Sequence, residues 1–374
     1  MVDIVAVKTK QQKRAFIDFP HELYRDDPNY VPELYLSQKE LLDERKNPFF
    51  QHSKADLFLA MRHGQVVGRI AAIRNNNYNT YAGDEVGFFG FFDLIDDYEV
   101  AEALLDRVKS WIKGEGLSAI YGPANFTTND TAGVLVDGFD RPPVVMMAYN
   151  KPYYPRFLEK YGFVSKMNLL AYLMTEDSVS RRTLELSGKL EDRLRAKGVS
   201  IRQVNLKKFD QEVDHILHIY KEAWKDNWGF VPPTEAEFRH LATGLKMIIN
   251  PEYAFIAESE GEAVAFSLAI PDINVIQRTI SRGRLFPFGI FKLLLGKNKI
   301  KRIRIITLGV LESHRRMGVE GVFYAKTIQA GLKNGVTEAE ASWILETNEM
   351  MNKGLLSLNA DPYKRYRIYE LSLA

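Results

Sequence analysis

The sequence predicts an α/β (α+β) protein of two tandem domains, each a mixed, mostly antiparallel sheet flanked by helices. The chain has 374 residues, and one domain usually holds about 100–200. Its two halves repeat one order of apolar patterns with the periods of strands and helices. Hydrophobic residues make up 46% of the chain and charged residues 26%, which is typical of globular proteins. We expect domains at residues 1–175 and 176–374.

Each half contains a β-hairpin, and the two hairpins match without a gap. Residues 57–68 and 254–265 alternate apolar side chains, turn at Gly64 or Gly261, and alternate again. This pattern is typical of strand, turn and strand. A repeat period of about 200 residues indicates a duplicated domain, because solenoid repeats are far shorter.

The elements after each hairpin also correspond. Both halves continue with an apolar strand, an amphipathic helix that ends near a glycine, a short strand, and a closing helix and strand. In the first half these are expected at 86–92, 98–113, 119–121 and 154–172; in the second half at 303–311, 319–332, 341–345 and 351–369. The second half carries an insertion at roughly 278–302, and the polar stretch 175–182 is the expected join.

Composition excludes several kinds of chemistry. The absence of cysteine excludes disulfides, thiolate nucleophiles, iron–sulfur clusters and cysteine-based zinc sites. The net charge of +2 gives no global attraction to DNA or other nucleic acid, nor to an anionic membrane. His215 and His218 are spaced like metal ligands, but no third ligand accompanies them, so we expect no metal.

No targeting or membrane-spanning segment is expected. The N-terminus lacks the basic start and apolar run of a signal peptide, and the most apolar stretch, residues 285–295, is too short to span a bilayer. We therefore expect a cytoplasmic protein. The apolar stretch is flanked by Arg and Lys, so it is either a packed surface helix or an amphipathic helix for a membrane surface or a partner. The sequence leaves the oligomeric state open.

The most informative motif reads LGVLESHRRMGVEG over residues 308–321. It resembles the acyl-CoA loop of the GNAT superfamily, the Gcn5-related N-acetyltransferases. In that family a strand is followed by a basic residue or Gln, two residues, Gly, one residue, and Gly or Ala. Arg315 and Gly318 fit the first positions, whereas Glu320 stands where the second small residue belongs and Gly321 follows it.

The resemblance implies that the second domain binds acetyl-CoA or another acyl-CoA as co-substrate. A helix start rich in glycine and arginine suits a pyrophosphate, because its free amides and cations both attract anions. In the family the next strand splays away to admit the pantetheine arm, and an Asn at its end contacts that arm. The cofactor-binding residues expected on this basis are Leu308, Val310, Leu311, Arg315, Arg316, Gly318, Val319, Gly321 and Asn348.

The resemblance also implies direct attack of an amine on the thioester. We expect a backbone amide near Val310 and Leu311 to bind the carbonyl oxygen. Glu312 is the expected general base and Glu346 the second choice, although Glu312 also suits a solvent-facing strand end. The tyrosine that the family often uses as general acid has no match in residues 351–356.

The first half resembles a degenerate GNAT domain. Aligning Gly90 with Gly309 sets Asp96 and Asp97 opposite the two arginines, and carboxylates would repel a pyrophosphate. The loop after its short strand is rich in small polar residues and resembles a segment of uncharacterised bacterial GNAT-like proteins. It forms either structural turns or the substrate side of the site. Trp224 and Trp228 line either an acceptor site or the core. The substrate-binding candidates are Asn125, Thr127, Asn129, Trp224 and Trp228.

These observations predict an N-acyltransferase, with acetyl as the expected acyl group, that acts on a small-molecule or peptide amine. Two alternatives remain open at this stage. A Fem-like aminoacyl transferase would use aminoacyl-tRNA instead of CoA. A non-catalytic GNAT pair would bind or sense acyl-CoA without turnover, which the departure at Glu320 and the missing tyrosine favour.

Overall fold

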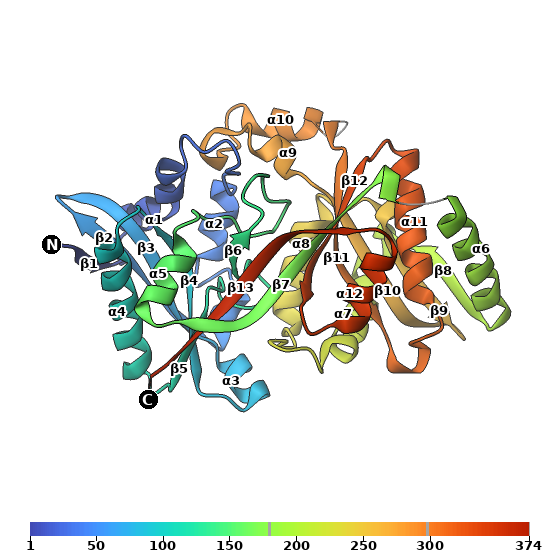
Figure 1. Cartoon of the computed structure of the whole chain (residues 1–374), viewed down its shortest axis with the longest axis horizontal. Helices are drawn as coiled ribbons and strands as arrows, with labels where there is room; N and C mark the ends of the chain where they lie inside the picture. Colours follow the sequence, from blue (N-terminus) through green and yellow to red (C-terminus); the bar gives the residue numbers. More distant parts are fainter. Residues whose placement is uncertain (179–180, 297–298, 374) are drawn as a thin grey trace. The chain divides into compact units, whose positions relative to one another are not determined.

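The computed structural model describes residues 1–178, 181–296 and 299–373 and divides the chain into two compact units (Figure 1). Unit 1 comprises Met1–Leu169, Asn274–Gly296 and Lys364–Ala374, and unit 2 comprises Leu170–Ile273 and Lys297–Tyr363. Most of the insertion of the second half, up to Gly296, and the end of its last strand thus belong to unit 1. The expected boundary at 175/176 follows the repeat in the sequence and stays a prediction.

Unit 1 is built on a sheet of strand order β1-β2-β3-β4-β5-β13. β4 and β5 are parallel and the other neighbours are antiparallel. Its strands are β1 (Asp3–Ala6), β2 (Lys54–Arg62), β3 (Gln65–Arg74), β4 (Val86–Leu94), β5 (Ala119–Gly122), β6 (Val134–Asp137), the start of β7 (Val164–Thr175) and the end of β13 (Asp361–Ser372). Its helices are α1 (Lys10–Leu23), α2 (Tyr35–Leu41), α3 (Asn76–Ala82), α4 (Tyr98–Gly114), α5 (Tyr154–Tyr161), α9 (Asn274–Gln277) and α10 (Gly289–Gly296).

The amphipathic pattern of α4 explains the core of unit 1. Val100, Leu104, Val108 and Ile112 recur at helical spacing, are fully buried, and share one cluster with residues of β2, β3 and β4. The helix lies very close to β3, because a Cβ on Gly68 would stand 2.8 Å from Leu104 Cδ1. This packing fixes α4, and with it the end of β4.

Unit 2 has the strand order β7-β12-β11-β10-β9-β8. Its further strands are β8 (Val199–Gln203), β9 (Ala254–Ser259), β10 (Glu262–Pro271), β11 (Arg302–Val310) and β12 (Glu338–Leu345). Its helices are α6 (Arg181–Ala196), α7 (Phe209–Trp224), α8 (Glu235–Lys246), α11 (Val319–Lys333) and α12 (Glu349–Ser357). α11 and α6 share one apolar cluster with the sheet, and α7 belongs to another that includes Phe266.

The structure confirms the predicted fold class and the repeated elements. Both hairpins are present, and the strand, helix, strand, helix, strand order follows in each half. One feature differs from expectation, because the loop after β5 contains the short strand β6, which pairs with β13. The insertion contains α9 and α10, and α10 confirms that the apolar stretch 285–295 contributes a helix. Positions 179–180 of the expected join lie outside the described residues. Within residues 1–178, 181–296 and 299–373, no helix is long and apolar enough to cross a membrane.

Candidate functional site

The sheet of unit 2 opens between β11 and β12. The two strands pair in parallel from Arg302 with Glu338 to Ile305 with Ala341. In the described residues their register ends there, although β11 continues to Val310 and β12 to Leu345. Beyond that point, the backbone N–H and C=O groups on the facing edges of β11 and β12 therefore form no ladder hydrogen bonds with each other. This is the splay that the resemblance implies for the pantetheine arm.

A left-handed turn places the start of α11 beside this opening. After a 3₁₀ turn at Glu312–His314, Arg316 has φ 63° and Gly318 has φ 88°. A Cβ on Gly318 would stand 2.7 Å from Leu190 Cδ2 of α6, so both the backbone angle and the space favour glycine. No side chain of the described residues caps the first amides of α11. Free amides and the helix dipole make this terminus suitable for an anion.

The two arginines of the loop have different surroundings. Arg315 is half-buried and donates from Nε to Val310 O at 3.4 Å and from a terminal nitrogen to Ala223 O at 3.3 Å. Arg315 therefore holds the loop to β11 and α7. Arg316 is exposed, and its charge is available to solvent beside the uncapped helix start.

The backbone amides at the end of β11 divide between the sheet and the opening. The Leu311 amide donates to Val264 O at 2.9 Å, so it is engaged within the sheet. Neighbouring amides of an extended strand point to opposite edges, so the Val310 amide faces the edge left by β12. Of the two amides expected for the carbonyl oxygen, Val310 has the suitable direction.

The acidic candidates lie after the two splayed strands. Glu312 follows β11 and Glu346 follows β12, and both are exposed. Because β11 and β12 are parallel, their carboxyl ends share one edge of the sheet. Asn348 is the N-cap of α12, and its Oδ1 accepts from the Met351 amide at 3.2 Å.

Trp224 packs beneath the end of β11. Its ring centroid lies 6.0 Å from that of Phe266 and 4.7 Å from that of Tyr220. A Cβ on Gly309 would stand 2.6 Å from the Trp224 ring. Trp224 is thus part of the packing that positions β11. Trp228 is half-buried in the turn after α7, and an acceptor role for either tryptophan stays a prediction.

The corresponding opening is closed in unit 1. β4 and β5 pair up to Phe88 and Tyr121, and the chain after β5 stays attached to β4. The Ala124 amide donates to Phe89 O at 2.8 Å, and the Phe91 amide donates to Asn125 Oδ1 at 2.8 Å. The Asn125 side chain therefore accepts a hydrogen bond from a backbone N–H of the central strand β4. Thr127 and Asn129 form a local turn, in which Thr127 Oγ1 accepts from the Asn129 amide at 3.1 Å.

In unit 1, carboxylates of the chain itself lie at the start of α4. Asp97 Oδ1 accepts from the Glu99 amide at 2.9 Å, and Arg62 donates to Asp97 at 2.7 Å and to Glu99 at 2.9 Å. Only residues 95–97 separate β4 from α4, whereas residues 311–318 separate β11 from α11. The loop that would hold a pyrophosphate is thus largely missing here.

The strand pairing corrects the alignment of the two halves. Gly68 and Ala265 hold the same position in the matching hairpins and pair with Leu94 and Val310. Leu94 therefore corresponds to Val310, and the alignment of Gly90 with Gly309 is wrong by three residues. It failed because the shorter loop of unit 1 was aligned without a gap.

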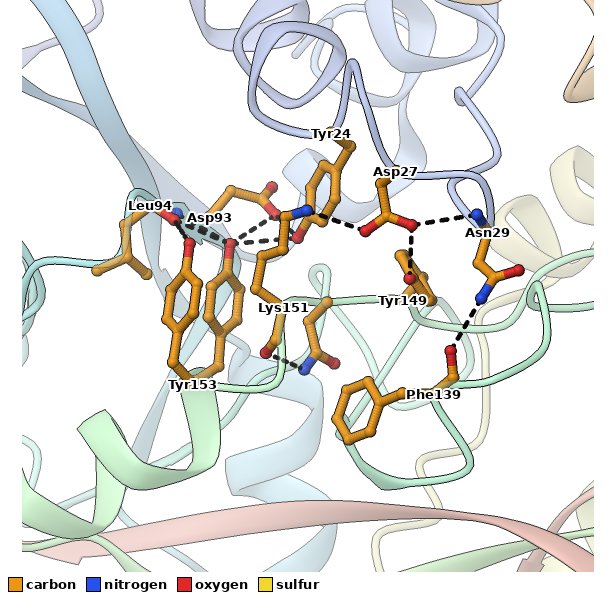
Figure 2. Close-up of polar contacts among 11 residues, drawn as sticks. Tyr24, Asp27, Asn29, Asp93, Leu94, Phe139, Tyr149, Lys151 and Tyr153 are labelled. Atoms are coloured by element: carbon orange, nitrogen blue, oxygen red, sulfur yellow. Dashed lines mark hydrogen bonds and ion pairs between the residues drawn. The ribbon is translucent and has the colours of Figure 1, made fainter.

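A buried polar network fills the end of β4 in unit 1, and the sequence analysis missed it (Figure 2). Asp93 accepts from Arg69 Nε at 2.8 Å and from the Tyr24 hydroxyl at 3.0 Å. The Leu94 amide donates to the Tyr154 hydroxyl at 2.9 Å. Burial, the Asp93 carboxylate and a neighbouring phenol raise the pKa of Tyr24 and of Tyr154 well above the ordinary value, so both phenols stay neutral.

A second group of polar contacts fastens the segment after α1. Asp27 accepts from Lys151 Nζ at 2.9 Å and from the Tyr149 hydroxyl at 2.9 Å, and Asn29 donates to Phe139 O at 2.9 Å (Figure 2). Burial opposes ionisation of Asp27, but these hydrogen bonds outweigh it and lower the pKa of its carboxyl. The buried Arg69–Asp93 pair had one signal in the sequence. Arg69 lies in the apolar strand β3 and Asp93, of opposite charge, lies in the adjacent apolar strand β4.

Comparison with known proteins supplies two full-length relatives. Protein YghO of Escherichia coli (strain K12) is 37% identical over 370 residues, which cover 96% of this chain and 93% of YghO. The protein named bacterial ceramide synthase of Caulobacter vibrioides is 33% identical over 379 residues, which cover 100% of this chain and 98% of that protein. No protein-family model matches the chain.

Solved structures give the fold of this family. A tandem GNAT protein from the clavulanic acid biosynthesis pathway matches with a TM-score of 0.61 at 11% identity, covering 100% of this chain and 99% of that one. The chain belongs to the same family as YghO and the Caulobacter protein, and it has the tandem GNAT fold. A GCN5-related N-acetyltransferase from Sphaerobacter thermophilus matches this tandem GNAT fold with a TM-score of 0.54 at 13% identity, covering 100% and 96% of the two chains.

In the described part of the chain, no group of His, Asp and Glu is placed to hold a metal ion.

Proposed function

We propose that this tandem GNAT protein is an N-acyltransferase that binds acyl-CoA in unit 2 and carries a degenerate copy in unit 1. The contrast between the two units is the observation that supports the proposal. In unit 2 the strands separate after Ile305 and the start of α11 has no side-chain cap. In unit 1 Asn125 bridges to β4 and Asp97 caps α4. One unit thus has both features of a CoA site and the other has neither.

The proposed roles follow from these positions. The amides of Val319 and Gly321 and the charge of Arg316 bind the pyrophosphate, and Gly318 makes the turn that aims them. Leu308 and Val310 line the arm, and Asn348 contacts pantetheine. Arg315 and Leu311 hold the loop in place through the bonds described above.

The proposed reaction is one direct acyl transfer. The amine nitrogen attacks the thioester carbon while the Val310 amide stabilises the developing oxyanion. Glu312, or Glu346 at the same sheet edge, takes the proton from the attacking amine. The carbon–sulfur bond then breaks, CoA leaves as the thiolate, and the acceptor becomes an amide. Binding both reactants in one place supplies much of the rate enhancement.

For the acceptor we propose a long-chain amino alcohol, with a fatty acyl-CoA as donor. The support is the relative named bacterial ceramide synthase, which aligns with the whole chain at 33% identity. A ceramide is the amide of a long-chain amino alcohol and a fatty acid, so its formation is an N-acyl transfer. Acetyl-CoA with a small-molecule or peptide amine is the second choice.

The experiment is a turnover assay with the purified full-length protein. Acetyl-CoA and palmitoyl-CoA are each offered with a long-chain amino alcohol, an amino sugar and a peptide amine, and released thiol and amide product are measured. We expect amide from the amino alcohol and palmitoyl-CoA, and a large loss with Glu312→Gln if that residue is the base. Binding of acyl-CoA without any amide product across the panel would contradict catalysis and favour an acyl-CoA sensor.

A further inference from the structure

The inserted segment that carries α9 and α10 is firmly attached to unit 1. Asn274 and Gln277 are buried and donate to Pro143 O and Pro32 O, each at 3.0 Å. Arg284 donates to Asp18 Oδ1 at 3.0 Å, and Arg282 forms an ion pair with Glu22. These side-chain hydrogen bonds and ion pairs hold the segment in one position on unit 1, so the same side chains of the segment stay on its outer surface.

The outer surface of this segment is unusually apolar. The helix α10 lies close to α9, because Cβ atoms on Gly289 and Gly296 would stand 2.9 Å and 2.8 Å from Ile280 and Ile276. Large apolar side chains of α10 and of the turn before it are exposed to solvent. The exposed fractions are 71% for Phe286, 73% for Phe288, 58% for Phe291, 59% for Leu294 and 79% for Leu295. Five large exposed apolar side chains within ten residues are typical of an interaction surface.

The segment lies in a stretch of sequence that has basic residues and no acidic ones. Between Asp272 and Glu312 the sequence contains no Asp or Glu. The same stretch contains nine basic residues: Arg278, Arg282, Arg284, Lys292, Lys297, Lys299, Lys301, Arg302 and Arg304. Within the segment of unit 1, Arg282 and Arg284 form ion pairs with Glu22 and Asp18, whereas Arg278 and Lys292 are exposed and border the apolar side chains. An apolar patch bordered by cations matches the apolar interior and anionic headgroups of a lipid surface.

We propose that Phe286–Leu295, here called the α10 patch, docks this protein on an anionic lipid bilayer by inserting its apolar side chains at the interface. A second copy of the chain fits less well, because two such patches would bring like charges together. The helix is too short to span a bilayer, so the docking is peripheral. It goes beyond the proposed acyl transfer and does not depend on it.

The test is sedimentation of the full-length protein with vesicles, without acyl-CoA or amine. Vesicles of phosphatidylcholine alone are compared with vesicles that also contain the anionic lipid phosphatidylglycerol. We expect binding to the anionic vesicles that weakens with salt. The double variant Phe291→Asp with Leu295→Asp should lower the partition coefficient by at least about tenfold, and Arg278→Glu should lower it by severalfold.

The control is Met247→Asp in the turn after α8. Met247 is 77% exposed, which is close to Leu295, but it lies in unit 2 and should leave the partition unchanged. Circular dichroism confirms folding of each variant. Equal partition of wild type and the double variant would overturn the proposal. The proposal would also be overturned if the wild-type protein did not bind vesicles but self-associated, and if the double variant were monomeric. Turnover with water-soluble amines is measured separately, so failure of docking and failure of catalysis are distinguishable.

Discussion

Replacing Gly318 by alanine tests the turn on which the proposed CoA site depends. An L-residue at φ 88° costs roughly 1–2 kcal/mol relative to glycine. The new Cβ would also stand 2.7 Å from Leu190 Cδ2, and moving a partly buried leucine side chain costs about 1 kcal/mol more. We therefore expect Gly318→Ala to lower the free energy of unfolding by about 2–3 kcal/mol. It should also weaken binding of CoA, because relief of the strain redirects the first amides of α11.

The assays are urea denaturation and calorimetric titration with CoA. Gly318→Asn should lose less stability than Gly318→Ala, because asparagine tolerates left-handed backbone better. The matched control is Gly244→Ala in α8, where a Cβ meets nothing within 4 Å and helix propensity should raise stability by about 1 kcal/mol. If Gly318→Ala leaves both stability and CoA affinity at the wild-type values, the described turn is not what positions α11.

Three further predictions concern unit 1. Asp93→Ala should cost about 3–5 kcal/mol in urea denaturation, because it leaves the buried Arg69 charge unpaired; a loss below about 1 kcal/mol would contradict the network. Asn125→Ala should cost about 1–2 kcal/mol by stripping a backbone amide of its acceptor, with CoA affinity unchanged; weakened CoA binding would refute a closed unit 1. Burial first, then the Arg69 charge, lowers the pKa of His21 to about 4. Its contribution to stability is therefore full above about pH 6.5 and is lost as the pH falls toward 4, amounting to about 2 kcal/mol between pH 7 and pH 5. His21→Gln should remove that part of the pH dependence, and identical profiles for variant and wild type would disprove it.

The fold could be predicted because local patterns and the duplication agreed. The helix α11 was expected at 319–332 and lies at Val319–Lys333, since its apolar spacing and the following Gly335 both mark it. The strand β6 was missed, because four residues within a Gly- and Pro-rich stretch give too short a period to recognise. Its partner β13 lies far along the chain, and such long-range pairing leaves no local signal.

The candidate site was predictable where one segment carries it. Gly318 and Arg316 could be proposed from the sequence because the loop, the helix start and the strand end are contiguous in it. The roles of individual side chains were harder to predict. Arg315 turns back to Val310 O, and Asn125 reaches Phe91 from a distant segment. The buried Lys364, which donates to Gly138 O at 2.5 Å and to Arg141 O at 2.7 Å, likewise depends on tertiary contacts that a single sequence does not display.

Calorimetric titration of the intact protein with acetyl-CoA and palmitoyl-CoA tests the central claim most directly. We expect one site per chain, loss of at least about tenfold in affinity with Arg316→Glu at the start of α11, and unchanged affinity with Asp96→Ala in unit 1. Asp96 is exposed and pairs with Arg156 on the surface, so its removal is a matched control. No detectable binding of either acyl-CoA, or binding that Arg316→Glu leaves intact, would contradict the assignment of the cofactor site to unit 2.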